Sequence, residues 1–213
     1  MKLIARSSIL VGMIALASCG SAPEEAAAPA PEAAAPVSTT WTLDTTDSRV
    51  AFASIKAGEI IETHYFQGLT GSVEPTGEVE VEIPLDLVET KVDIRNERMR
   101  EMFFETSSFP TATITGTVDL EAFANLAIGD RLQTFITGTL SLHGNEAPID
   151  ADVFVTRIDS ARVEVASAEP VVVFLSDYNL EAGLEALRDI AALPSITASS
   201  PVTFTFVFDA EDA

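Results

Sequence analysis

The stretch VTFTFVF, residues 202–208, decides the fold class of this 213-residue chain. Every second side chain from Val202 to Phe208 is apolar, and Thr203 and Thr205 fall between them. A period of two places successive side chains on opposite faces of an extended strand. We therefore expect a β-strand with one buried, largely aromatic face and one face toward solvent.

The same period of two recurs earlier in the chain. In residues 78–83 valine and isoleucine alternate with glutamate, and in residues 149–155 apolar residues alternate with Asp150 and Asp152. Acidic outer positions are typical of antiparallel sheets that bury one face. Alternating or β-branched residues predict strands at four more places: residues 48–55, 111–118, 133–142 and 163–165. About eight strands fit an all-β domain that forms one closed or nearly closed barrel, which leaves few exposed strand edges.

Two segments break this rhythm and predict short helices. Residues 92–104 carry a run of charged residues between two expected strands, and we expect a short helix or helical loop there. In residues 179–193 leucines recur at helical spacing, with Asn179 in position to cap the start and Pro194 just beyond the end. One or two short helices are therefore expected beside the barrel.

The N-terminus has the pattern of an exported lipoprotein. Lys2 and Arg6 precede an apolar stretch that is short for a membrane span, which predicts a signal peptide over residues 1–18. The sequence Leu-Ala-Ser-Cys that ends at Cys19 resembles the lipobox of bacterial lipoproteins, in which the cysteine is acylated. As the only cysteine, Cys19 has no partner within the chain for a disulfide. The alternative is an ordinary signal peptide cut near Ala17, with Cys19 left as a free thiol.

Residues 19–40 are rich in Ala, Pro and Glu, without apolar periodicity and with prolines that interrupt helices. We expect the lipidated Cys19 and this tether to hold the following domain at a membrane. Because Gly20 rather than Asp follows the cysteine, the resemblance to bacterial lipoproteins implies sorting to the outer membrane. The expected location is the cell envelope, with the domain facing the periplasm.

The charge of the chain argues against one class of partner. The sequence has 33 acidic against 12 basic residues, for a formal net charge of −21. Such a surface repels the phosphate backbone of nucleic acids. We therefore expect no nucleic-acid partner, although acidity by itself identifies no ligand.

Candidate catalytic groups are few. The only histidines, His64 and His143, lie far apart in the sequence and match no zinc-site spacing. The sequence has no G-x-S-x-G nucleophile elbow and no phosphate-binding glycine loop. We therefore predict a binding protein rather than an enzyme, with no catalytic residue, metal or cofactor. A lipid-modifying enzyme that uses His64 or His143 with a carboxylate is the alternative.

Phenylalanine is the commonest aromatic residue, with 12 Phe against two Tyr and one Trp. Phenylalanine supplies a large apolar area without a hydroxyl that needs a hydrogen-bond partner. The interior of an eight-stranded barrel is either filled by side chains or wide enough for one slender ligand. Composition alone therefore leaves both a packed core and a lined tunnel open.

Several short motifs occur in order along the domain. An opening strand is followed by a histidine-containing strand, a charged stretch before two adjacent phenylalanines, and a late strand that ends in His-Gly. The motifs are WTLD (41–44), SRVAF (48–52), HYF (64–66), RNERMR (95–100), FFE (103–105), FPTAT (109–113) and GTLSLHG (138–144). Together they resemble the YceI-like, polyisoprenoid-binding family. The chain departs from the family's pattern at Asn96 and Arg98, where many members have Asp and His.

The resemblance implies an extended, lipocalin-like antiparallel barrel of eight strands over residues 41–213, with an elongated apolar cavity. Members of the family bind polyisoprenoid chains, including quinone-like lipids. We therefore expect a polyisoprenoid or isoprenoid-quinone ligand, bound for transport or storage in the cell envelope. The alternative is an envelope stress or interaction lipoprotein whose barrel is packed and holds no lipid. The alternation and the motifs predict six phenylalanines that line the cavity: Phe52, Phe66, Phe103, Phe104, Phe135 and Phe206.

Overall fold

The computed structural model describes residues 39–211. The predicted signal peptide, the predicted acylation site at Cys19 and nearly all of the predicted tether therefore lie outside the described residues. Within residues 39–211, no helix combines the length and the apolar character that a crossing of the bilayer requires.

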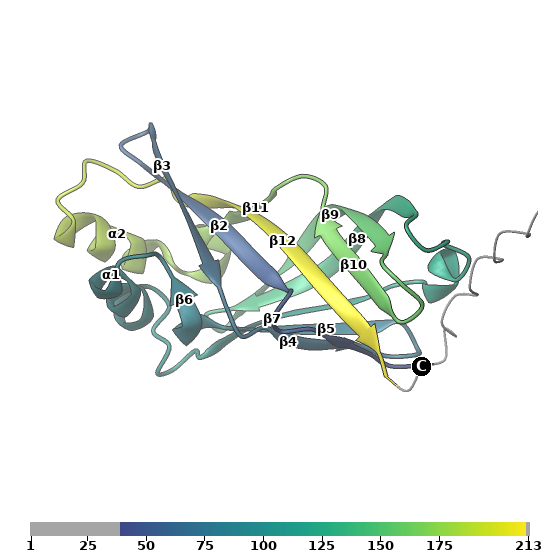
Figure 1. Ribbon diagram of the computed structural model, residues 1–213. Helices are drawn as coiled ribbons and strands as arrows, with labels where there is room; N and C mark the ends of the chain where they lie inside the picture. Colours follow the sequence, from purple (N-terminus) through teal and green to yellow (C-terminus); the bar gives the residue numbers. More distant parts are fainter. Residues whose placement is uncertain (1–38, 212–213) are drawn as a thin grey trace, which may run out of the picture. The chain divides into compact units, whose positions relative to one another are not determined.

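Twelve strands form one antiparallel sheet, and eight of them close into a ring (Figure 1). The ring runs in the order β1 (Trp41–Leu43), β4 (Thr70–Val73), β5 (Glu78–Pro84), β7 (Thr111–Thr117), β8 (Arg131–Leu142), β9 (Asn145–Arg157), β10 (Arg162–Ser167) and β12 (Ser199–Ala210), and then returns to β1. Four strands lie outside the ring: β2 (Arg49–Lys56), β3 (Ile60–Phe66), β6 (Val88–Glu89) and β11 (Val171–Phe174). The eight-stranded antiparallel barrel expected from the sequence is confirmed.

Strand β12, the stretch that predicts the fold class, pairs along both of its edges. Its first half lies between β2 and β11, and its second half lies between β1 and β10. In the register, Phe204 is opposite Val50 of β2, and Phe208 is opposite both Leu43 of β1 and Val163 of β10. This strand therefore closes the barrel and also connects it to the β2–β3 hairpin.

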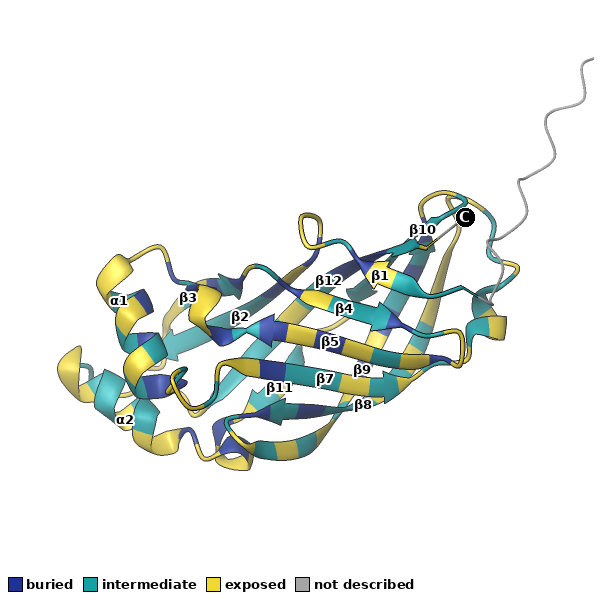
Figure 2. Cartoon of the chain, turned by 90° about the horizontal axis from the view of Figure 1, so that it is seen from below, coloured by how far each residue is buried: buried dark blue, intermediate teal, exposed yellow. Residues whose placement is uncertain are grey.

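The in–out alternation read from the sequence is present on the barrel wall. On β5 the three glutamates are exposed, while Val81 and Ile83 are buried, and Figure 2 shows the alternating colours along this strand. On β9, Ala151 and Val153 are buried and Asp152 is exposed. The acidic residues of these strands therefore face solvent, and the core lies inside the barrel.

Two short helices cover one end of the barrel (Figure 1). The first is α1 (Asp93–Arg98), which continues as a π-helical turn over Met99–Phe103. The second is α2 (Glu181–Ile190), which packs against that turn. The approach is close, because a Cβ on Gly183 would lie 2.7 Å from the carbonyl oxygen of Met102. Three further single turns of 3₁₀-helix span Leu85–Leu87, Leu120–Phe123 and Leu175–Tyr178.

The prediction that Asn179 caps α2 is wrong. The helix starts two residues later, at Glu181, and Leu180 stands at the cap position without a side-chain hydrogen bond. Asn179 instead ends the preceding 3₁₀ turn in the left-handed conformation, with φ of 54°. Asparagine tolerates this conformation better than most residues. Its side-chain amide donates to Asn145 Oδ1 at 3.0 Å rather than capping the helix.

Arg162, the first residue of β10, joins three parts of the chain where the ring closes. Its Nη1 donates to the two carboxylate oxygens of Asp209 in β12 at 2.8 and 2.9 Å. Its Nη2 donates to Asp44 and Asp47, between β1 and β2, at 2.6 Å each. The hydrogen bond from Arg162 holds the pKa of Asp44 below its usual value, so Asp44 stays ionised at neutral pH. The guanidinium therefore binds three carboxylates that would otherwise repel one another.

Replacing Arg162 with methionine should lower the free energy of unfolding by roughly 1–2 kcal/mol, because a bidentate network contributes more than an exposed ion pair. Urea unfolding followed by circular dichroism at pH 7 measures this. The matched control is Arg188→Met, which removes only an exposed pair with the adjacent Asp189 and should have a much smaller effect. If the two substitutions lowered the free energy of unfolding equally, the Arg162 network would contribute no more than an exposed ion pair.

Candidate functional site

The larger of two apolar cavities, about 380 Å³, lies at the end of the barrel covered by the helices. Strands β2, β3 and β12 supply one part of its wall, and the π-helical turn and α2 supply another. Four of the six predicted phenylalanines line it and pack ring against ring. The ring centroids are 5.3 Å apart for Phe52 and Phe66, 5.7 Å for Phe66 and Phe104, and 4.8 Å for Phe103 and Phe104.

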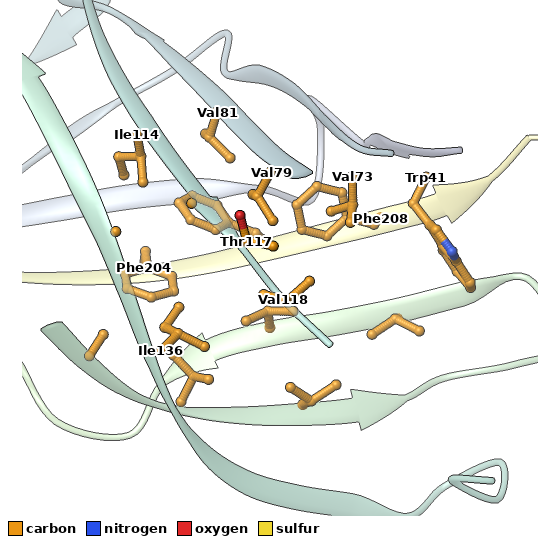
Figure 3. Close-up of a pocket in the computed structure, with 18 of the residues that line it drawn as sticks. Trp41, Val73, Val79, Val81, Ile114, Thr117, Val118, Ile136, Phe204 and Phe208 are labelled. Carbon is orange, nitrogen blue, oxygen red and sulfur yellow. The ribbon is translucent and has the colours of Figure 1, made fainter. Parts of the chain in front are cut away.

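A second cavity of about 190 Å³ lies inside the barrel ring. Figure 3 shows side chains from several strands, among them Val79, Ile136 and Phe208, around this space. Phe206, the fifth predicted phenylalanine, lines this cavity rather than the larger one. The two cavities have four lining residues in common: Ile114, Ile149, Val171 and Phe204. They therefore adjoin, and the apolar lining continues from one into the other.

Small residues at inward positions leave this interior open. Gly116 of β7 and Gly138 of β8 are paired in the register and both line the smaller cavity. Ala151 of β9 lines the same cavity, and Ala112 of β7 lines the larger one. A barrel of eight strands has an interior that large side chains can fill completely. The space exists because these strands place glycine or alanine where a bulky residue would close it.

The prediction that Phe135 lines the cavity is wrong. Its side chain is 58% exposed on the outer face of β8, and neither cavity includes it in its wall. The inward residues of this strand are the even-numbered ones, such as Ile136 and the buried Leu140 and Leu142. Since side chains alternate along a strand, an inward Leu140 and Leu142 require an outward Phe135.

A small group of polar side chains interrupts the apolar lining of the larger cavity. His64 is only 4% exposed, and its Nε2 lies 3.0 Å from Ser54 Oγ. Its Nδ1 is buried and has no hydrogen-bond partner among residues 39–211. Burial, together with the positive charges of Arg95, Lys56 and Lys91, lowers the pKa of His64 from 6.5 to about 4. The imidazole is therefore neutral at neutral pH.

Two cations next to this histidine share one carboxylate. Lys56 Nζ bonds to Glu62, and Arg95 Nη1 donates to the same Glu62 oxygen at 2.9 Å. Arg95 Nη2 donates to the Thr90 carbonyl oxygen at 2.5 Å, whereas its buried Nε has no hydrogen-bond partner among the described residues. Burial lowers the pKa of both Lys56 and Arg95 from their ordinary values. This corner of the cavity thus offers hydrogen-bonding groups within a wall that is otherwise apolar.

The opening of the larger cavity is marked by residues that line it and are also exposed to solvent. Val92 and Ile94, at the start of α1, are 43% and 50% exposed, and Ile190, at the end of α2, is 48% exposed. At these residues the wall of the cavity meets the protein surface. The opening therefore lies beside the two helices.

The second histidine of the catalytic alternative, His143, has hydrogen-bonding partners outside both cavities. His143 lies at the turn between β8 and β9, where its Nε2 is 3.1 Å from Glu105 and its Nδ1 is 3.2 Å from the Tyr178 carbonyl oxygen. It lines neither cavity. Within residues 39–211, no group of His, Asp, Glu or Cys side chains is arranged to hold a metal ion.

Sequence reasoning missed most of the smaller cavity and the opening of the larger one. Trp41, the valines of β5 and the paired glycines line the smaller cavity, yet the alternation and the motifs were used to predict phenylalanines only. In each strand every second residue points inward, and this alternation holds for small residues too. It is the signal that could have identified them. For the opening, the apolar residues Val92 and Ile94 within a charged stretch were the available signal.

The buried, neutral His64 predicts a pH dependence of stability. Between pH 6.5 and 4 the unfolded chain binds a proton at this residue more readily than the folded protein does. The free energy of unfolding should therefore fall as the pH falls through this range, by about 3 kcal/mol in total, and should not depend on His64 above about pH 7.

Urea unfolding at a series of pH values checks this, with emphasis on pH 5 to 6.5, where carboxylates remain largely ionised. His64→Gln should flatten the dependence, and His143→Asn, as the matched control, should retain it. A wild-type protein whose stability does not change between pH 5 and 6.5 would contradict the assignment.

Comparison with known proteins agrees with this architecture. A model of the YceI-like domain matches residues 41–210. A solved structure described as a polyisoprenoid-binding domain from Saccharophagus degradans, implicated in plant cell wall breakdown, is 39% identical, with a TM-score of 0.79; the match covers 81% of this chain and 99% of that chain. BcnA of Burkholderia cenocepacia is 14% identical with a TM-score of 0.56, over 78% of this chain and 98% of that chain, and supports the fold alone. No curated protein sequence matches this chain significantly. The chain belongs to the YceI-like family.

Proposed function

We propose that the two adjoining cavities bind the isoprenoid chain of a polyprenol or an isoprenoid quinone, for transport or storage in the cell envelope. Acylation of Cys19 would hold the protein at a membrane, with the domain on the periplasmic side of the outer membrane. The continuous apolar lining that runs from the opening into the barrel is the observation that carries this proposal. The solved relative described as polyisoprenoid-binding supports a lipid ligand.

The energetics favour a long and slender apolar ligand. Burial of apolar surface contributes about 25 cal/mol per Å², or about 0.8 kcal/mol for each methylene group. A prenyl chain is insoluble in water along its whole length, so each unit that enters the cavity adds to the affinity. Most of the wall supplies branched and aromatic carbon, so the depth of the cavities would select chain length.

The polar corner of the larger cavity suits the head of such a lipid. His64 Nδ1 is free to form a hydrogen bond, and Ser54, Lys56 and Arg95 are close to it in the same wall. A neutral imidazole can donate to or accept from an uncharged oxygen. We therefore place the polar end of the ligand near His64 and the chain toward the barrel interior.

Two other functions receive less support from the geometry. A packed barrel would have no adjoining apolar cavities, so the envelope interaction protein without a ligand is not favoured by any described feature. The family and its polyisoprenoid-binding neighbour are binding proteins. We therefore propose no catalytic residue.

Native mass spectrometry of residues 39–213, purified without detergent and then extracted with organic solvent, tests the proposal directly. Both core clusters lie between Leu43 and Phe208. The match to the solved relative covers 81% of this chain and 99% of that chain. This fragment therefore contains a complete folding unit. We expect a bound species with the mass of a prenyl-repeat lipid. A fragment that is empty, and that also takes up neither polyprenol nor quinone from detergent solution, would overturn the proposal.

A substitution that fills the smaller cavity should shorten the preferred ligand. Ala151→Leu places three more carbon atoms in the smaller cavity without introducing charge. Excluding even two methylene-sized groups of the chain should weaken binding of long prenols by roughly tenfold, at about 0.8 kcal/mol each. Short prenols that do not reach this cavity should bind as before. Competition between prenols of different length, measured by extraction and mass spectrometry, detects the shift.

The matched control is Ala182→Leu, the same change at an exposed position of α2 that lines neither cavity. It should leave the chain-length preference unchanged. If Ala151→Leu binds long and short prenols in the wild-type ratio, the chain does not enter the smaller cavity.

A further inference from the structure

The opening of the larger cavity is surrounded by exposed isoleucines and a valine. Ile94, Val92 and Ile190 belong to the cavity wall, as described above. Ile60 and Ile61, at the tip of the β2–β3 hairpin, are 51% and 65% exposed. These five residues are called the rim below. Large apolar side chains that are exposed together mark sites of interaction rather than ordinary surface.

The hairpin tip belongs to the same end of the molecule as the opening. Ile60 is paired with Lys56, which lines the cavity, and residues directly opposite in an antiparallel pair face the same side. Ile60 therefore continues the inward face of β3 beyond the cavity wall, whereas Ile61 projects from the other face of the same tip. The tip is also fixed to the segment after α2, since the Ala57 amide donates to the Ser195 carbonyl oxygen at 3.0 Å.

Charge distinguishes this end from the rest of the domain. The chain as a whole has 33 acidic against 12 basic residues. Around the opening, however, residues 89–98, which carry Val92 and Ile94, contain three acidic residues and three basic ones, Lys91, Arg95 and Arg98. This segment therefore lacks the acidic excess of the chain, and an anionic membrane surface repels it less.

We propose that the rim inserts into the surface of a lipid bilayer, so that an isoprenoid chain can pass between the bilayer and the cavity without entering water. The inference rests on the proposed function, because only a ligand that resides in the membrane requires such a docked opening. The exposed residues of the rim are branched aliphatic, and three of them also belong to the cavity wall, so a ligand that leaves the cavity meets apolar side chains at the surface. A bilayer can cover these side chains and receive an apolar ligand at the same place, whereas a protein partner would only cover them. Continuity between the rim and the cavity wall therefore favours a lipid surface.

Flotation of residues 39–213 with phosphatidylcholine vesicles tests the proposal. The test variant is the pair Ile60→Asp and Ile61→Asp, because neither residue lines a cavity. The matched control is Phe135→Asp, compared with the single variant Ile61→Asp, because each places one aspartate at an apolar residue of similar exposure, 58% for Phe135 on the outer face of β8 and 65% for Ile61. We expect the wild type to float with the vesicles, the double variant to bind at least about tenfold more weakly, and the control to bind within about twofold of the wild type.

Uptake of a polyprenol from detergent solution separates this inference from the proposed function. The double variant should take up the polyprenol as the wild type does, since its cavity wall is intact. Equal vesicle binding by the wild type and the double variant, or equal loss in the control, would overturn docking by the rim. Wild-type protein that takes up polyprenol but does not float would also overturn it, and a rim-dependent dimer in sedimentation velocity would make a second copy the partner. Failure of the wild type to take up polyprenol would instead count against the proposed function.

Discussion

The pairing of β12 along both of its edges is the constraint on which the rest of the structure depends. Because β1 and β10 are the two ends of one run of seven strands and both pair with β12, along opposite edges, the sheet has to close on itself. Closure separates the two faces of every ring strand into an inside and an outside, and it removes strand edges that would otherwise pair with other chains. It also places three aromatic side chains of one strand along the interior: Phe204, Phe206 and Phe208. The cavity is therefore a consequence of closure combined with the small residues on the opposite wall.

The fold class could be predicted from the sequence because alternation is a local property. Val81 and Ile83 face inward and their glutamate neighbours outward for the same steric reason in any strand. The prediction for Phe135 did not follow this alternation. Its size and apolar character suggested an inward position, yet the parity of β8, fixed by Leu140 and Leu142, places it outside. Periodicity within the strand is stronger evidence than the chemistry of one residue, since a shift by one position would reverse every side chain on the strand.

Other features depend on contacts between distant segments, and local patterns do not determine them. The environment of His64 requires Ser54 from the adjacent strand and Arg95 from α1, which only the folded chain brings together. Gly116 and Gly138 are unremarkable in the sequence and meet only when β7 and β8 take their register. The N-terminus of α2 was mispredicted because the preceding turn, packed beside Asn145, uses Asn179 for its own end. Elements could thus be predicted from the chain, whereas the open volume and its polar corner could not.

If the protein is a tethered lipid carrier, as we propose, the two ends of the barrel have different requirements. Trp41 pairs with Ala210, and in Figure 1 this end of the described chain lies away from α1 and α2, beside which the cavity opens. A twelve-residue strand such as β12 extends about 40 Å, so a short anchor at Trp41 would hold the opening far from the membrane. A chain with the length and proline content of residues 19–40 could extend on the order of 60 Å. On the proposal that Cys19 is acylated, a tether longer than the barrel wall is what allows one lipid anchor to coexist with an opening that faces the same bilayer. If that segment were shorter than the barrel, the anchor and the opening could not both reach the bilayer. The length of the tether is therefore part of the proposed lipid-exchange function.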